Sequence, residues 1–248
     1  PKKVSGTFCR ANPHQPYVGS GAFSHKAGMH VDAILKSSEA YEHINPALIG
    51  NERRFLISEL SGRSGIMRVA SDLGLNMEER KEVVPRVLQR VKKLESEGYH
   101  LENADATMRL IFLRELGQNI EPFKIMRWKV STTKETDIRV KAEVTVEVDR
   151  DEYQEVGEGV GPVHSLDIAL RKALIRRFPQ LDRVRLVNYK VTVVDSVTGT
   201  ASSVRVFIEF RDNGHTWATT AVSRNITEAS ETALAEGYIY WLLSRSLA

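Results

Sequence analysis

The sequence contains a single cysteine, Cys9, among 248 residues, which excludes an internal disulfide framework and suits a reducing cytoplasm. No apolar run approaches the roughly 20 residues that a membrane-spanning helix needs, and no signal peptide is visible. Lys and Arg number 35 against 32 Asp and Glu, and no arginine-rich run accompanies this near balance. The composition therefore predicts a cytoplasmic globular protein that binds neither nucleic acid nor a membrane.

The sequence also lacks the short motifs that carry common chemistries. It has no HxH, HExxH or CxxC pattern, no GxSxG motif and no P-loop, so we expect this chain to bind no metal or other cofactor by itself. The stretch 15–66 nevertheless gathers three histidines and five cationic side chains among Gly, Ser and Tyr. This mixture predicts half of a site whose other half lies elsewhere. The chain begins with Pro1 rather than Met, as a fragment or a processed chain would.

Apolar residues in the first half recur at helical spacing. Pro85 interrupts one of these periodic stretches and should kink or restart its helix. Glycines are expected to end the later helices. The predicted helices cover about residues 30–36, 64–73, 77–97 and 103–116.

The second half is a tandem duplication in the sequence. Residues 138–148 alternate apolar and polar side chains, which is typical of a half-buried strand, and a helical pattern follows at 165–177. Both patterns return further along the chain, at 204–210 and 229–243. One constant displacement, which places Val140 on Val204, superimposes the two copies.

We therefore predict an α+β fold, with mainly helical linker subdomains followed by two βββα units. The expected domains are a linker arm and first subdomain at 1–50, a helical subdomain at 51–121 and a duplicated domain at 122–248. Each unit of the duplicated domain would bury one face of its sheet against a helix or against the other unit.

Several blocks of the sequence resemble one known family. They are QPYVG (15–19), AFSHKAGMHVDAILK (22–36), YEHINPALIGNERR (41–54), SELSGRSGI (58–66), ESEGY (95–99) and NITEAS (225–230). With these blocks the chain resembles the C-terminal portion of the α-isopropylmalate synthase and citramalate synthase family, and it is most similar to the citramalate synthase branch. The resemblance implies linker subdomains followed by an allosteric dimerisation domain that gives feedback regulation.

The resemblance also implies that the chemistry is completed outside this chain. In that family an N-terminal TIM barrel binds a divalent metal (Mg²⁺, Mn²⁺ or Zn²⁺) and condenses acetyl-CoA with a 2-oxo acid, which is pyruvate in the citramalate branch. This chain has neither the barrel nor its HxH pair, so it is expected to be inactive alone. The implied assembly is a homodimer in which this region contacts its own barrel and that of the partner subunit.

Two residues of the first half match the catalytic residues of that family. His30 lies in AGMHVDA and matches a histidine that reaches the partner's barrel, where a neutral imidazole can relay a proton. Tyr41 lies in YEHINP and matches the tyrosine that accompanies it. Each has a structural alternative, since His30 could bridge a short helix and Tyr41 could be an interface aromatic.

In the second half, LVNYKVTVVDSVTGTASS (186–203) matches the stretch that lines the amino-acid pocket of the family. The match assigns Leu186, Tyr189 and Val193 to an apolar wall and Thr198 and Thr200 to the polar groups of the ligand. Ordinary strand core and a turn remain the alternative. The implied effector is isoleucine in the citramalate branch or leucine in an isopropylmalate synthase, and a stand-alone amino-acid-binding module without an enzymatic role is a further interpretation.

Overall fold

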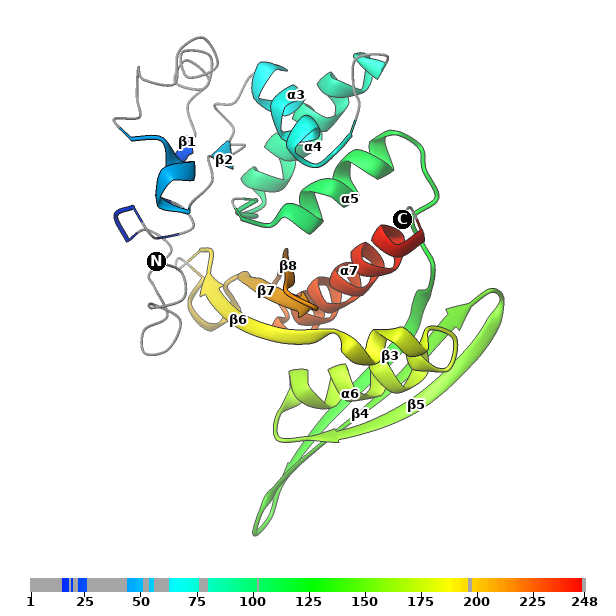
Figure 1. The fold of residues 1–248 in the computed structure, drawn as a ribbon. Coiled ribbons are helices and arrows are strands. Elements are labelled where there is room, and N and C mark those ends of the chain that lie inside the picture. Colours follow the sequence, from blue (N-terminus) through cyan, green and yellow to red (C-terminus); the bar gives the residue numbers. More distant parts are fainter. Residues whose placement is uncertain are drawn as a thin grey trace. The chain divides into compact units, whose positions relative to one another are not determined.

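The computed structural model describes residues 15–17, 19, 22–25, 44–50, 54–55, 63–75, 80–101, 103–195 and 198–246 (Figure 1). Their packing divides the chain into two compact units. The first consists of residues 1–95 with 101–103, and the second of residues 96–100 with 104–248. None of the described helices is long and apolar enough to cross a membrane.

The described part of the first unit contains short strands and helices. The strands β1 and β2 pair in parallel, Ser24 with Arg54 and His25 with Phe55. The predicted helix at 64–73 is confirmed, and Gly74 follows it with a φ of +72°. The elements are β1 (Ser24–His25), η2 (Pro46–Ile49), β2 (Arg54–Phe55), α3 (Arg63–Asp72) and α4 (Val83–Ser96).

The helix α4 has a proline, Pro85, close to its first residue. Since the helix starts at Val83, Pro85 lies in the first turn, where the missing N–H removes no intrahelical hydrogen bond. The helix predicted at about 77–97 therefore begins at Val83 in the described residues, close to the proline that was expected to interrupt it. The apolar side chains then recur at helical spacing and are buried; they are Val83, Val84, Val87, Val91 and Leu94.

The second unit contains two antiparallel three-stranded sheets, in the orders β3-β4-β5 and β6-β7-β8. This arrangement confirms the predicted α+β class and the two βββα units. Its elements are α5 (Asp105–Glu115), β3 (Lys124–Lys134), β4 (Ile138–Val148), β5 (Asp151–Gly159), α6 (Pro162–Ile175), η4 (Pro179–Arg183), β6 (Arg185–Val193), η5 (Gly199–Ala201), β7 (Val204–Asp212), β8 (His215–Ser223) and α7 (Ile226–Ser246).

The strand registers show how closely the two βββα units correspond. Val144 pairs with Glu155 in the first sheet, and Ile208 pairs with Thr219 in the second. Both members of the pair are therefore shifted by the displacement that the sequence predicts. The first strand of each unit does not follow this displacement. The strand β6 begins earlier than the displacement from β3 predicts, and the connection from β6 to β7 is longer than that from β3 to β4.

Each first strand also carries an irregularity near its beginning. The register shifts between Ile125 and Arg127 in β3 and between Leu186 and Asn188 in β6. An extra residue at such a point changes which side chains share a face of the strand. The duplication therefore extends to a local feature of the backbone.

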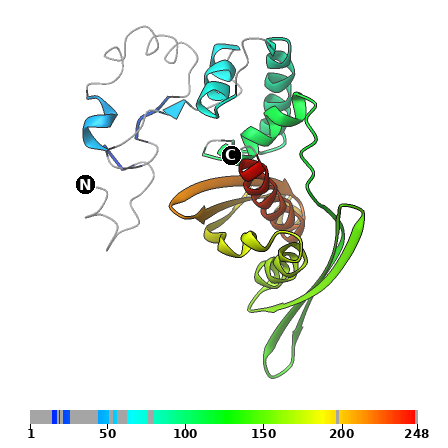
Figure 2. The same ribbon diagram turned by 45° about the vertical axis from the view of Figure 1, so that its right-hand side comes forward.

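Each sheet packs one face against the helix of its own unit, and α6 and α7 lie side by side (Figure 2). In the second βββα unit, formed by β6, β7, β8 and α7, the core is aromatic. The rings of Phe210 and Trp217 stack with centroids 5.7 Å apart, and Tyr238 of α7 packs against Phe210. The indole N–H of Trp217 donates to the Gly237 carbonyl at 3.0 Å. This hydrogen bond satisfies the polar atom of a fully buried ring.

The helix α5 packs against β8 and α7. It covers β8, an edge strand, whose unpaired backbone groups would otherwise be open to other chains. The Ala218 N–H donates to the Asp105 carboxylate at 2.8 Å, and the Thr220 N–H donates to the Thr107 hydroxyl oxygen at 3.0 Å. The packing therefore joins α5 to the duplicated half, while the predicted division into three domains stays a prediction.

A buried carboxylate completes the attachment of α5. Glu236 of α7 is 9% exposed. It accepts a hydrogen bond from the Thr107 hydroxyl at 3.0 Å and forms an ion pair with Arg114 at 2.8 Å. Both partners lie on α5, so one side chain of α7 holds that helix at two places along its length.

Close packing of α6 on β5 depends on Gly157. An alanine Cβ there would lie 2.2 Å from the Ser165 carbonyl oxygen and 2.6 Å from the Ala169 nitrogen. We expect Gly157→Ala to lower the free energy of unfolding, measured with urea, by about 1–3 kcal/mol or more, because backbone atoms cannot move aside as a side chain can. Gly161→Ala is the control, since no atom lies within 4 Å of the added Cβ. Its cost should stay below about 1 kcal/mol, and equal losses would contradict the steric explanation.

Candidate functional site

Three side chains of the predicted amino-acid pocket lie on one face of β6, which we call the β6 face. The ladder pairs Leu186 with Phe210, Tyr189 with Ile208 and Val193 with Val204. Because those β7 partners are separated by even numbers of residues, they share a face of the sheet, and so do the three β6 residues. Leu186 and Tyr189 are three residues apart and would alternate faces in a regular strand. The extra residue of the bulge between Leu186 and Asn188 brings them together.

The β6 face is turned towards α7. The Tyr189 hydroxyl lies 2.9 Å from the Ser230 hydroxyl oxygen. Ser230 donates its own proton to the Ile226 carbonyl at 2.6 Å, so Tyr189 is the donor between the two hydroxyls. The lone pairs of the Tyr189 oxygen are then available to a polar group of a ligand.

Exposure along the β6 face suits a site for a small apolar ligand. Leu186 and Tyr189 are half-buried, and Val193 is 56% exposed. A branched aliphatic side chain laid across these residues would remove apolar surface from water, which is the main favourable term in binding of this kind. The arrangement can therefore offer an apolar wall with one phenol at its centre.

The two predicted threonines lie beyond that face. Thr198 and Thr200 are exposed and belong to the connection between β6 and β7, around η5. The Thr198 hydroxyl donates to the Ser202 hydroxyl at 3.2 Å, and Ser202 donates to the Gly199 carbonyl at 2.6 Å. These bonds stabilise the turn itself, which follows the last residue of β6. Their role in binding stays a prediction.

The predicted catalytic residues His30 and Tyr41 lie outside the described residues. Their assignment rests on the sequence blocks that contain them and stays a prediction. Within the part of the chain that the structure describes, no group of three or more His, Cys, Asp or Glu side chains is placed to hold a metal ion.

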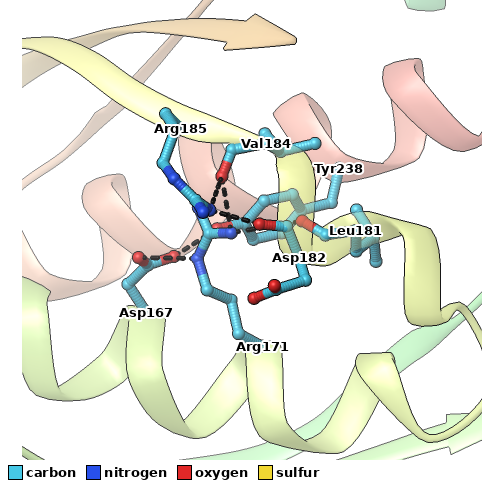
Figure 3. Close-up of polar contacts among 7 residues, drawn as sticks. All are labelled: Asp167, Arg171, Leu181, Asp182, Val184, Arg185 and Tyr238. Atoms are coloured by element: carbon cyan, nitrogen blue, oxygen red, sulfur yellow. Dashed lines mark hydrogen bonds and ion pairs between the residues drawn. The ribbon is translucent and has the colours of Figure 1, made fainter.

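A polar cluster that the sequence analysis missed joins the two units of the repeat (Figure 3). Arg171 of α6 donates to the Asp167 carboxylate at 3.0 Å and to the carbonyl oxygens of Leu181 and Val184 at 3.3 and 2.8 Å. The Tyr238 hydroxyl of α7 donates to the same carboxylate. The guanidinium carbon of Arg171 also lies 5.1 Å from the centroid of the Tyr238 ring. The cluster therefore ties α6, η4 and α7 together.

The charges of this cluster follow from its burial. Burial raises the pKa of Tyr238 well above its usual value, and the neighbouring Asp167 carboxylate raises it further. Tyr238 therefore keeps its proton and remains a hydrogen-bond donor. Burial by itself would lower the pKa of Arg171, but Tyr238 and Asp167 outweigh that effect and the net pKa is raised. A protonated phenol and a charged guanidinium thus share one carboxylate.

The only sequence signal for this cluster is the spacing of Asp167 and Arg171, four residues apart on a helix. The equivalent positions in the second copy of the repeat are Glu231 and Ala235. Glu231 has therefore no arginine one turn further on, and burial raises the pKa of its half-buried carboxyl. The ion pair between Asp167 and Arg171 therefore has no counterpart at the equivalent positions of the second βββα unit. A comparison of the two copies in the sequence could have singled out this pair of residues.

Two protein families match different parts of the chain. Residues 102–242 match the LeuA allosteric (dimerisation) domain, and residues 17–99 match the homocitrate synthase post-HMGL domain-like family. The match over residues 102–242 coincides with the duplicated βββα fold and defines this part of the chain as an allosteric dimerisation domain. The chain belongs to the LeuA allosteric (dimerisation) domain family, which confirms the resemblance seen in the sequence.

Several relatives of similar sequence are named (R)-citramalate synthase. The (R)-citramalate synthase of Sulfolobus acidocaldarius is 44% identical over 236 residues, which are 95% of this chain and 44% of that protein. The (R)-citramalate synthases of Geobacter sulfurreducens and Aquifex aeolicus are 41% and 37% identical, each over 93% of this chain and 44% of the relative. The chain thus spans less than half the length of the curated relatives that it matches.

Proposed function

We propose that this chain is the accessory and feedback-regulatory part of an (R)-citramalate synthase, which makes citramalate and CoA from pyruvate, acetyl-CoA and water. The observation that carries the proposal is the match of (R)-citramalate synthases from three organisms to 93–95% of the chain. The single cysteine, Cys9, supports a cytoplasmic location for this enzyme.

In this proposal the chemistry is divided between two regions of the protein. A catalytic barrel outside the chain binds the divalent metal and acetyl-CoA. His30 relays a proton during attack of the acetyl enolate on the ketone of pyruvate, and Tyr41 orients a water or a carboxylate beside it. Two copies form a homodimer, so that these residues reach the barrel of the partner subunit.

The effector in this proposal is isoleucine, the end product of the pathway. Its branched side chain lies on the β6 face, and its polar groups meet the Tyr189 hydroxyl and the threonines of the β6–β7 connection. Binding shifts the population of the linker helices and so the placement of His30 and Tyr41. Allosteric coupling of this kind is typically worth about 1–3 kcal/mol.

Calorimetric titration of the chain with isoleucine, leucine and valine tests the regulatory role. Isoleucine should bind most tightly. Tighter binding of leucine would reassign the region to an isopropylmalate synthase. A folded dimer that binds none of the three would overturn the regulatory function.

We predict that His30→Ala or Tyr41→Phe in the protein that includes the barrel lowers turnover with little loss of stability. Removal of a group that transfers a proton typically costs about 10²- to 10⁴-fold in rate, and we expect the larger loss at His30. Steady-state assays of CoA release and melting curves measure the two quantities. Unchanged turnover with a melting temperature lower by many degrees would show that the residues are structural.

A further inference from the structure

The turn that follows α4 packs tightly on the end of the β6–β7 hairpin. Gly98, two residues after the last residue of α4, has a φ of +96°. A Cβ at this position would lie 2.2 Å from the Val194 Cγ1 atom. Only a glycine fits this combination of backbone conformation and close approach. The contact is therefore a specific one between residue 98 and the residue after β6.

The other strand of the hairpin holds the same glycine. Arg205 of β7 donates from its guanidinium to the Gly98 carbonyl oxygen at 2.9 Å, in a part-buried position. A charged donor makes this bond stronger than one between neutral groups. We call Gly98, Val194 and Arg205 the Gly98 clamp.

Two residues of the clamp are sequence neighbours of the last residue pair of the β6–β7 ladder. Val193 pairs with Val204 at the end of the β6–β7 ladder, and the clamp residues Val194 and Arg205 follow these two directly. The Val194 N–H donates to the Ser203 carbonyl at 2.9 Å, so one further backbone hydrogen bond joins the two segments just beyond the end of β6. Val194 follows Val193 directly in a bend just after β6. Because the two residues share a peptide bond, a displacement of Val193 would be transmitted through the backbone to Val194.

We propose that the Gly98 clamp is the contact through which occupancy of the β6 face is passed to α4. This inference rests on the proposed function, because it requires an amino acid on that face. A ligand that displaces the paired residues Val193 and Val204 displaces both strands that hold Gly98. The carbonyl of Gly98 is fixed by Arg205 and its Cα by Val194, so the turn moves with the hairpin. The end of α4 moves with the turn.

Arg205→Ala removes the polar half of the clamp, and Arg211→Ala is its matched control. Both arginines lie on β7 and point to the same face, since their positions along the strand differ by an even number. Arg211 is exposed. The experiment measures isoleucine affinity by calorimetry and amide hydrogen exchange in residues 83–96, with and without saturating isoleucine, on the whole 248-residue chain.

In the unsubstituted chain and in Arg211→Ala, isoleucine should change the exchange rates of α4 amides by roughly fivefold or more, the lower end of typical allosteric coupling. In Arg205→Ala this response should disappear while isoleucine still binds. Val194→Ala, which removes the methyl groups that contact Gly98, should reduce it. A melting curve of each variant separates loss of coupling from loss of folding.

Three results would overturn the inference. If isoleucine binds the unsubstituted chain without any response in α4, the clamp transmits nothing. The same conclusion follows if Arg205→Ala and Val194→Ala both keep the full response. If a folded chain binds no branched-chain amino acid, the proposed function fails together with this inference.

Discussion

Replacing Tyr189 by alanine should weaken isoleucine binding by at least about 30-fold, the loss expected when a central aromatic contact worth about 2 kcal/mol is truncated. The ring lies in the middle of the β6 face, between Leu186 and Val193, and its hydroxyl is held by Ser230 at 2.9 Å. Truncation removes both the apolar surface that the ligand covers and the oxygen that can accept its ammonium group. Isothermal calorimetry of the purified chain measures the change.

Two further variants divide this effect between the ring and its hydroxyl. Tyr189→Phe keeps the ring and loses the hydrogen bond to Ser230, so it should cost up to about tenfold in affinity. Val193→Ala should cost less than Tyr189→Ala, because a valine offers a ligand less apolar surface than an aromatic ring does. Unchanged affinity in Tyr189→Ala would place the site away from the β6 face.

Selectivity between isoleucine and leucine is limited by the same physics. The two amino acids are isomers, so an apolar wall can distinguish them only by shape. Differences of this size are worth roughly 1–3 kcal/mol, or about 10- to 200-fold in affinity. Val193 has a stiff β-branched side chain and can enforce such a shape preference. A substitution at Val193 should therefore change the ratio between the affinities for isoleucine and leucine more than it changes their average.

Arg171→Met is expected to lower the free energy of unfolding by about 3–5 kcal/mol, as when one partner of a buried ion pair is removed. Asp167 would keep only the Tyr238 hydroxyl, and the carbonyl oxygens of Leu181 and Val184 would lose the guanidinium that bonds them. Both charged side chains are largely covered, with 16% and 17% exposed for Arg171 and Asp167. Urea unfolding followed by tryptophan fluorescence measures the loss.

An exposed arginine nearby provides the control. Arg177 pairs with Asp149 at 2.9 Å, but the two side chains are 56% and 65% exposed. Arg177→Met should therefore cost less than about 1 kcal/mol. The double variant Asp167→Leu with Arg171→Met removes the uncompensated charge and should recover part of the loss. Equal effects of Arg171→Met and Arg177→Met would contradict the importance of burial.

The repeat was predictable because its signals are local. Alternation over 138–148 and 204–210, each followed by a helical period, depends on which side chains a single strand or helix buries. The constant displacement between the copies follows from these patterns, and it holds for both ends of β5 and β8 and for the first residues of α6 and α7. Pro85 was likewise informative, because a proline constrains its own turn of helix.

Which residues share the β6 face could not be predicted from the alternation of side chains along the strand. Period-two spacing alone would put Leu186 and Tyr189 on opposite faces, and only the bulge between Leu186 and Asn188 places them together. A bulge is set by how a strand fits its neighbour, and its extra residue has no distinctive side chain in this sequence. The family resemblance grouped the two residues, and the register supplies the physical reason.

The sequence by itself determined the class of fold, the duplication and the family, since each is encoded in periodicity or in contiguous blocks of residues. Only the tertiary structure decided which polar side chains meet. The Tyr238 hydroxyl reaches Asp167 across 71 residues, Arg205 reaches Gly98 across 107, and Thr107 reaches Glu236 across 129. Such pairs leave no local pattern, because their separation along the chain is set by the packing of whole helices and sheets.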